Sequence, residues 1–198
     1  MKNIFVLLAT AFIMQSCVSS LSQYQGAKTL GQGNISNTLV GQNTFNESGN
    51  ETILAYVYSR GINNKTDLGF GLGIARRGFG FGTNIKRAII EDRLSLNLPL
   101  VYKQTRFGDK RIEVSPSLLF TYNPQKKIKN TLNFQLIFEK YLYPDISVTE
   151  SSFYLSHNWE FNKNKFYFYP EIGLQNYGIG TDNVLIKFGL GFSYKRIN

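Results

Sequence analysis

The stretch VLIKFGLGFSYKR, residues 184–196, decides the fold class of this 198-residue chain. Its even positions carry valine, isoleucine, phenylalanine, leucine, phenylalanine and tyrosine, whereas its odd positions carry leucine, lysine, two glycines, serine and lysine. Side chains of a β-strand alternate between the two faces of a sheet, so the stretch predicts a strand with one continuous apolar face. The other face is too small and too charged for an ordinary core. We therefore expect the apolar face to point outward at lipid.

The same alternation returns in the glycine-rich segment DLGFGLGIARRGFGFG, residues 67–82, which predicts a hairpin. Glycine destabilises a strand, so repeated glycines on one face need a reason, and close packing inside a narrow barrel provides one. The first strand, expected over 28–45, has the weakest alternation. Further alternating or β-rich runs occupy 52–60, 94–103, 112–121, 132–139, 153–161 and 166–175.

These runs predict an all-β protein, an antiparallel up-and-down transmembrane β-barrel of about ten strands, with eight as the alternative. Strand lengths of about 9 to 12 residues match a tilted crossing of the hydrocarbon layer. An even strand number places both termini on one side, for which we expect the periplasm. The turns at 61–65, 89–93, 123–130 and 162–165 would then face the periplasm, and the loops at 46–51, 76–78, 104–110, 143–150 and 177–183 would face outward.

The first sixteen residues combine Lys2 with an apolar run that is too short to span a bilayer, which predicts a signal peptide over 1–16. The only cysteine follows at once, and Met14 to Cys17 resembles the lipobox of bacterial lipoproteins. That resemblance implies cleavage before Cys17, its acylation, and a lipidated tether over 17–27 ahead of a barrel over 28–198. The alternative is a conventional leader cleaved nearby, with no role for Cys17. A single cysteine precludes an intramolecular disulfide.

The net charge of +9 suits contact with anionic lipid or lipopolysaccharide phosphates and, by charge alone, would also suit nucleic acid. The export signal and the scattered basic residues argue against a nucleic-acid partner. A mean hydropathy of −0.19 excludes a bundle of membrane helices. It does not exclude a membrane barrel, whose apolar residues alternate with polar ones.

With its leader, its glycine-rich hairpins and its final strand FGLGFSYKR, the chain resembles the small outer-membrane β-barrel proteins of Gram-negative bacteria over residues 28–198. The resemblance implies a place in the bacterial outer membrane. It also implies assembly by the barrel-assembly and lipoprotein-sorting machinery. The chain departs from the usual pattern at its end, where Ile197 and Asn198 replace the expected terminal aromatic residue.

Charged residues occur on the predicted inward rows in balanced numbers. Unpaired charges would be costly inside a narrow barrel, so we expect a lumenal charge network, with a gated polar pathway for small solutes as the alternative. Its expected members are Lys86, Lys103, Glu113, Glu139, Glu160, Glu171, Lys187 and Lys195. On the outward loops, basic side chains could contact lipopolysaccharide phosphates or simply be solvated. These residues are Arg76, Arg77, Arg106, Lys110 and Arg111.

The sequence predicts no catalysis, no cofactor and no metal site. His157 is the only histidine, and it falls on the same face of its expected strand as the apolar residues. No general base with a side chain that could orient it is evident. One histidine and an acylated cysteine cannot supply a metal site. Three prolines, Pro99, Pro116 and Pro170, fall inside expected strands of a barrel that has no edge, so we expect bulges or strand ends there.

Two functional hypotheses follow. The first is an integral outer-membrane barrel lipoprotein with a structural, surface-interaction or minor porin-like transport role. The alternative is a periplasmic lipoprotein whose soluble, lipocalin-like barrel carries an apolar ligand. The two invert the faces of the barrel, because a lipocalin-like cavity needs large apolar side chains inside. The positions that alternate with the apolar ones carry mostly glycine, serine, asparagine, lysine and glutamate. Such residues could hardly line an apolar cavity, so the pattern favours the first hypothesis.

Overall fold

The computed structural model describes residues 25–46, 49–76, 78–142, 148–177 and 184–196. These residues form one antiparallel sheet that closes on itself, because β1 pairs with β11 from Ile35 opposite Arg196 to Phe45 opposite Ile186. The strands are β1 (Ile35–Asn46), β2 (Gly49–Asn63), β3 (Thr66–Ala75), β4 (Gly78–Ile90), β5 (Leu94–Thr105), β6 (Lys110–Val114), β7 (Ser117–Thr121), β8 (Ile128–Tyr141), β9 (Thr149–Lys163), β10 (Phe166–Tyr177) and β11 (Val184–Arg196). Within the described residues, no helix is long and apolar enough to cross a membrane.

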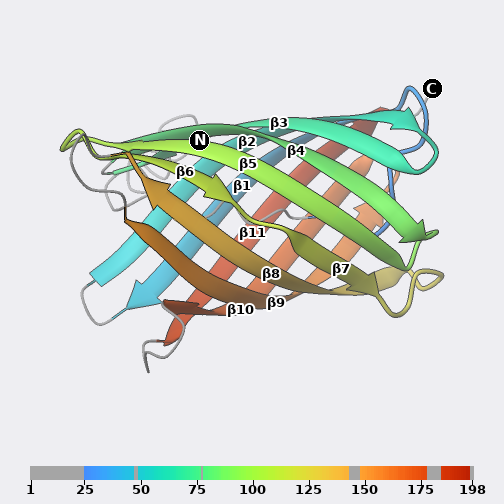
Figure 1. Ribbon diagram of the computed structural model, residues 1–198. Coiled ribbons are helices and arrows are strands. Elements are labelled where there is room, and N and C mark those ends of the chain that lie inside the picture. The colour runs from blue at the N-terminus through green and yellow to red at the C-terminus, as the bar shows by residue number, and fades with distance from the viewer. Residues whose placement is uncertain (1–24, 47–48, 77, 143–147, 178–183, 197–198) are drawn as a thin grey trace, which may run out of the picture.

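The closed sheet is a ten-stranded barrel, which confirms the predicted fold (Figure 1). β6 and β7 are two halves of one strand, since both lie between β5 and β8. All other neighbours in the barrel are consecutive in the chain, apart from the pair that closes it. The barrel is therefore of the up-and-down type.

Most large apolar side chains lie on the outer wall and most inward-facing side chains are polar, apart from a small buried cluster of Val40, Ile53, Ala55 and Tyr169. On β11, Phe192 is 57% exposed, whereas its neighbour Ser193 is 3% exposed. The same contrast recurs on β3, where Leu72 is exposed and the flanking glycines are buried. An outer wall of this composition is that of a barrel surrounded by lipid, the reverse of a water-soluble β-barrel.

The three prolines lie where the hydrogen-bond ladders are interrupted. Pro116 separates β6 from β7, as a strand end. Pro99 lies within β5 opposite this break, because the pairing of β5 with β7 stops at Asn97 and that with β6 begins at Leu100. Pro170 lies within β10 at a gap in its ladder with β9. A residue without a backbone N–H is tolerated at such gaps because no ladder bond is lost.

The two ends of the barrel differ. One end, here the short-turn end, has the turns at 64–65, 91–93, 122–127 and 164–165 and the last residues of β11. Asp92 and Asn164 have positive φ values in two of these turns, as expected for residues that tolerate the left-handed region. The other end, here the loop end, carries the connections that follow β1, β3, β5, β8 and β10.

The chain enters the barrel later than the sequence indicated. The first strand was expected over 28–45, but β1 begins at Ile35. The backbone turns at Gly31 and Gly33, both with positive φ, and the Gly33 N–H then donates to the carbonyl oxygen of Gly61 at 2.9 Å. Gly61 must lack a side chain, because a Cβ there would overlap the backbone of Gly31. Residues 25–34 consequently form a separate segment at the short-turn end.

Candidate functional site: a polar lumen closed by the N-terminal segment

Neutral polar side chains line much of the lumen and bond to one another across strands. Asn84 on β4 donates from its amide nitrogen to Asn97 on β5 at 3.1 Å, and Asn97 donates to the Ser117 hydroxyl on β7 at 3.3 Å. All three are at most 5% exposed. Gly69 on β3 leaves the space that Asn84 fills, since a Cβ there would overlap the amide. The glycine row thus makes room for lumenal side chains.

A charged cluster lies toward the loop end. Lys103 on β5 contacts both Glu113 on β6 and Glu139 on β8. The Arg111 guanidinium lies 3.5 Å from Glu139, and the Ser115 hydroxyl donates to Glu113 at 2.6 Å. Burying three charges is costly, and here each carboxylate faces a cation or a hydrogen-bond donor, which offsets that cost.

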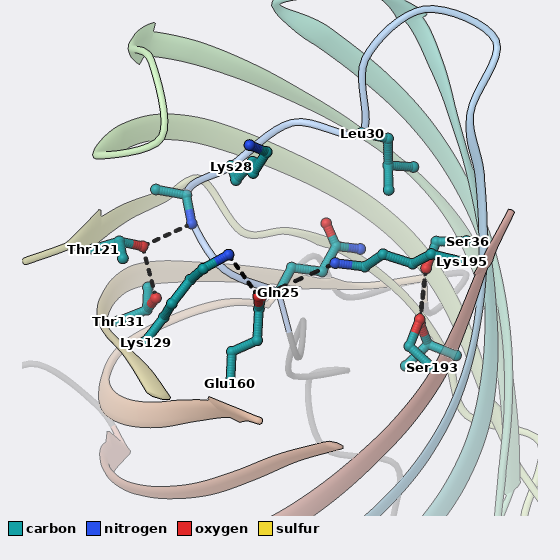
Figure 2. A network of polar contacts seen from close by, with 12 residues as sticks. Gln25, Lys28, Leu30, Ser36, Thr121, Lys129, Thr131, Glu160, Ser193 and Lys195 are labelled. Atoms are coloured by element: carbon teal, nitrogen blue, oxygen red, sulfur yellow. Dashed lines mark hydrogen bonds and ion pairs between the residues drawn. The ribbon is translucent and has the colours of Figure 1, made fainter. Parts of the chain in front are cut away.

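Two further ion-pair groups lie toward the short-turn end. Lys86 and Asp67 are direct partners on β4 and β3, and their charged atoms are 3.2 Å apart. Glu160 on β9 lies between Lys129 at 3.0 Å and Lys195 at 4.0 Å, as Figure 2 shows. Each buried carboxylate in these groups therefore has an opposite charge close by.

The last two expected network members meet through a tyrosine. The Tyr154 hydroxyl on β9 donates to Glu171 on β10, and the Lys187 ammonium lies 5.1 Å from the centre of the Tyr154 ring. The tyrosine fits because β10 has Gly173 beside it, where a Cβ would overlap the ring. Hydrogen bonding and a cation–π contact thus connect these two charges.

All eight residues expected in the lumenal charge network face the lumen, but they form separate groups and do not make one continuous network. Three partners were missed: Asp67, Lys129 and the lumenal role of Arg111. The alternation of side chains along a strand could have placed these three residues on the inward face. Each lies an even number of positions from an expected inward residue on its own strand. Asp67, for example, is on the same row as Gly69.

The N-terminal segment, Gln25 to Asn34, lies across the lumen at the short-turn end, and Figure 2 shows Gln25 and Leu30 inside the barrel wall. We call it the plug. Ala27 is fully buried, and its N–H donates to the Thr121 hydroxyl at 3.1 Å. The Asn158 amide on β9 donates to the Gln25 carbonyl at 3.4 Å. Because β7 and β9 both pair with β8, these two contacts bind the plug to one part of the wall.

The ion pair of Asp67 and Lys86 also holds the plug backbone. Asp67 accepts the Leu30 N–H at 3.0 and 3.1 Å from its two oxygens. Lys86 donates to the Lys28 carbonyl at 2.8 Å. The two charged side chains thus bind two consecutive peptide groups of the plug, one through its carbonyl oxygen and the next through its N–H. Charge-assisted hydrogen bonds of this kind are stronger than neutral ones. The plug is bound chiefly through its backbone, which explains why its sequence shows no conspicuous pattern.

The residues expected at the outer surface divide into two sets. Arg76, Arg106 and Lys110 are exposed at the loop end, and Arg77 lies outside the described residues. Arg111 instead turns toward Glu139, with its guanidinium 4.2 Å from the centre of the Tyr141 ring. The expected signal peptide over 1–16 and Cys17 lie outside the described residues. Of the expected tether, residues 25–27 are described and belong to the plug.

His157 lies on the outer wall, with its ring 4.3 Å from that of Trp159 and its Nε2 3.1 Å from the Tyr122 hydroxyl. This is an aromatic contact group on the apolar face, and the lumenal carboxylates lie on the other side of the wall. Among the residues that the structure describes, no three histidine, cysteine, aspartate or glutamate side chains gather in a way that could hold a metal ion.

Comparison with known proteins finds no matching family model and no matching curated protein sequence. Among solved structures, the chain is similar to the KdgM porin, with a TM-score of 0.54 and 13% identity over 79% of this chain and 99% of the porin. The chain has an outer-membrane β-barrel fold. Neisserial surface protein A matches at a TM-score of 0.43 and 7% identity, over 81% of this chain and 95% of its own.

OprG from Pseudomonas aeruginosa matches at a TM-score of 0.43 and 6% identity, covering 88% of this chain and all of OprG. At 13% identity, the similarity to the KdgM porin shows the fold and nothing about activity.

Proposed function

We propose that this protein is an integral lipoprotein of the bacterial outer membrane that closes its own lumen and has a structural or surface-interaction role. The observation that carries this proposal is the plug. Its backbone bonds to Thr121, Asn158, Asp67 and Lys86, which lie on four different strands around the lumen. A segment bound from several sides closes a narrow barrel, so free passage of solutes is not the resting state.

The outer wall supports insertion in a membrane. Its apolar residues run the length of the strands, and aromatic rings pack together near the short-turn end, where Phe168 and Phe192 are 4.8 Å apart and Phe166 and Tyr194 are 5.4 Å apart. Such rings suit the boundary between hydrocarbon and headgroups. The lipocalin-like alternative is disfavoured because most of the described lumenal residues are polar or charged, and the apolar cluster among them is small.

The orientation is part of the proposal. The short-turn end, the plug and the last residues of β11 would face the periplasm, and the loop end would face outward. A lipid on Cys17 would lie in the periplasmic leaflet, and the chain from Cys17 to Gln25 can span at most about 29 Å when fully extended. A lipid anchor in that leaflet requires this linker to leave the barrel through the short-turn end. A minor small-solute transport role would require the plug to leave its site.

Cell fractionation tests membrane insertion. We expect the protein to stay in the outer-membrane fraction after alkaline extraction and to migrate faster on a gel when it is not heated. Extraction at alkaline pH with no heat-dependent shift would overturn the proposal. Labelling with a palmitate analogue, with Cys17→Ser as the control, tests the lipid anchor separately.

Planar-bilayer recording tests the closed lumen. We expect the purified protein to insert and to show no steady conductance, with openings that are brief and rare. A stable open pore in the unmodified protein would show that the plug does not seal the lumen.

A further inference from the structure

The rim of the loop end has a notch on its outer face. β3 ends at Ala75 and β4 begins at Gly78, so their hairpin is short. Ala75 pairs with Ile53, and β2 extends beyond that pair to Gly49. On the other side, Gly78 pairs with Thr105, and the β5–β6 turn at 106–109 lies beyond that pair. The hairpin is therefore flanked by two longer neighbours.

A hollow of about 450 Å³ occupies this notch. Its lower part is apolar, formed by Leu54, Ile74 and Phe79, which are 45%, 52% and 45% exposed on the wall that faces lipid. Its upper part includes Arg76 from the β3–β4 turn and Arg106 from the β5–β6 turn. The hollow thus combines an apolar floor with two cations at the level of the rim.

Neither arginine has an ion-pair partner among the described residues. Arg111, five residues beyond Arg106 along the chain, is paired with Glu139 and stacked on a tyrosine. Two exposed arginines that line the same hollow suit an oxyanion, because each guanidinium can donate two parallel hydrogen bonds to a phosphate. Phe107, at the tip of the second turn, is 82% exposed, as suits a ring that rests among lipid.

We propose that the notch binds one phosphorylated glycolipid of the outer leaflet, the lipid A part of lipopolysaccharide. Its phosphate lies between Arg76 and Arg106, and one of its acyl chains covers Leu54, Ile74 and Phe79. The two arginines complement the charge of a phosphate, and the apolar floor below them suits an acyl chain. A lipid phosphate at the membrane boundary lies at the level of the two arginines. The acyl chain attached to it then packs against the apolar wall below them. The inference rests on the proposed orientation, in which the loop end faces outward.

The test uses the purified mature protein, folded in detergent and free of lipopolysaccharide, with bound lipid counted by native mass spectrometry during titration with lipid A. We expect the double variant R76Q/R106Q to bind lipid A at least about tenfold more weakly, because charge-assisted contacts are removed. The matched control is R60Q/R87Q, which removes two exposed outward arginines at the short-turn end. This control should leave the affinity unchanged. Both variants are first checked for the heat-dependent gel shift of a folded barrel.

A second titration uses lipid A from which both phosphates have been removed. We expect it to bind the unmodified protein as weakly as intact lipid A binds R76Q/R106Q. Equal binding of the two lipids, or equal losses in the two arginine variants, would overturn the proposed site.

Failure of the orientation is separable from failure of the site. Lys110→Cys places a thiol at the loop end, and an impermeant maleimide should label it on intact cells. Absence of that label, with labelling after the membrane is opened, would refute the outward orientation. The detergent titration would still report whether the notch recognises the phosphate.

Discussion

The hydrogen bonds of Asp67 and Lys86 with the plug backbone allow a quantitative prediction. Asp67→Asn keeps the shape of the side chain but removes its charge. The Leu30 N–H then donates to a neutral acceptor, which weakens this hydrogen bond by about 1 kcal/mol. Lys86, whose side chain is only 3% exposed, loses its counter-ion. Breaking a buried pair from one side costs about 3–5 kcal/mol.

Part of that cost is relieved when the plug leaves, because water can then hydrate Lys86. If only about 1 kcal/mol of it is relieved in this way, the docking equilibrium shifts by about 2 kcal/mol in total, which is about a 30-fold rise in the undocked population. The plug would still be docked most of the time if its docking free energy exceeds this shift. We therefore expect the plug to undock more often but to remain docked most of the time.

The assay is thiol labelling of Ala27→Cys in purified protein that also carries Cys17→Ser, so that only one thiol is present. Ala27 is fully buried, so its labelling rate reports the undocked fraction. The matched control is Asp92→Asn, which breaks the exposed ion pair of Asp92 with Lys28, whose atoms are 3.1 Å apart. An exposed pair contributes at most about 1 kcal/mol, so this control should accelerate labelling by at most about fivefold.

Two results would refute the reasoning. If Asp67→Asn accelerates labelling no more than Asp92→Asn does, the buried ion pair does not hold the plug. If the otherwise unmodified plug is labelled at Ala27→Cys as fast as at the exposed position Lys28→Cys, the plug is not docked at all. The same Asp67→Asn variant should also raise the frequency of openings in planar bilayers.

The remaining predictions concern the free energy of unfolding in lipid vesicles, measured from the urea dependence of the heat-shifted band. Lys103→Gln leaves two buried carboxylates without the lysine between them and should lower this free energy by about 3–5 kcal/mol, whereas Lys129→Gln, at a partly exposed pair, should lower it by about 1 kcal/mol or less. Equal losses of unfolding free energy in the two variants would refute the idea that burial makes the Lys103 ion pairs more important. Gly173→Ala overlaps the Tyr154 ring and should cost about 1–3 kcal/mol, whereas Gly41→Ala, where a Cβ meets open space, should be nearly neutral. A neutral Gly173→Ala would contradict the packing of this tyrosine.

The fold could be predicted because its signal is local. A period of two, as in Leu68, Phe70 and Leu72, follows from the geometry of a single strand, and it also determines which side chains face lipid. The inward position of Lys103 or Glu171 followed from the same parity. The prolines could be placed only approximately, because the gap in the ladder opposite Pro99 depends on the neighbouring strand.

The grouping of the lumenal charges could not be predicted in the same way. Parity states that Glu160 points inward, but its contact with Lys195 joins positions on two strands that are not neighbours, across β10. Such contacts depend on the stagger of the strands and the curvature of the closed wall. Arg111 shows the same limit, because its place in the β5–β6 region suggested a solvated loop, whereas the start of β6 turns it toward Glu139.

The sequence by itself determined the class of this protein, its apolar outer wall and its polar interior, because alternation is a property of each strand alone. Only the tertiary structure decided how the barrel is closed at its short-turn end. Residues 25–34 have no periodicity to reveal their place, since they bind through backbone groups to side chains that come together only after the barrel forms. The final strand, Val184–Arg196, pairs with the first and so closes the barrel that the alternation predicted. The segment before that first strand, expected to be part tether and part strand, is instead the plug.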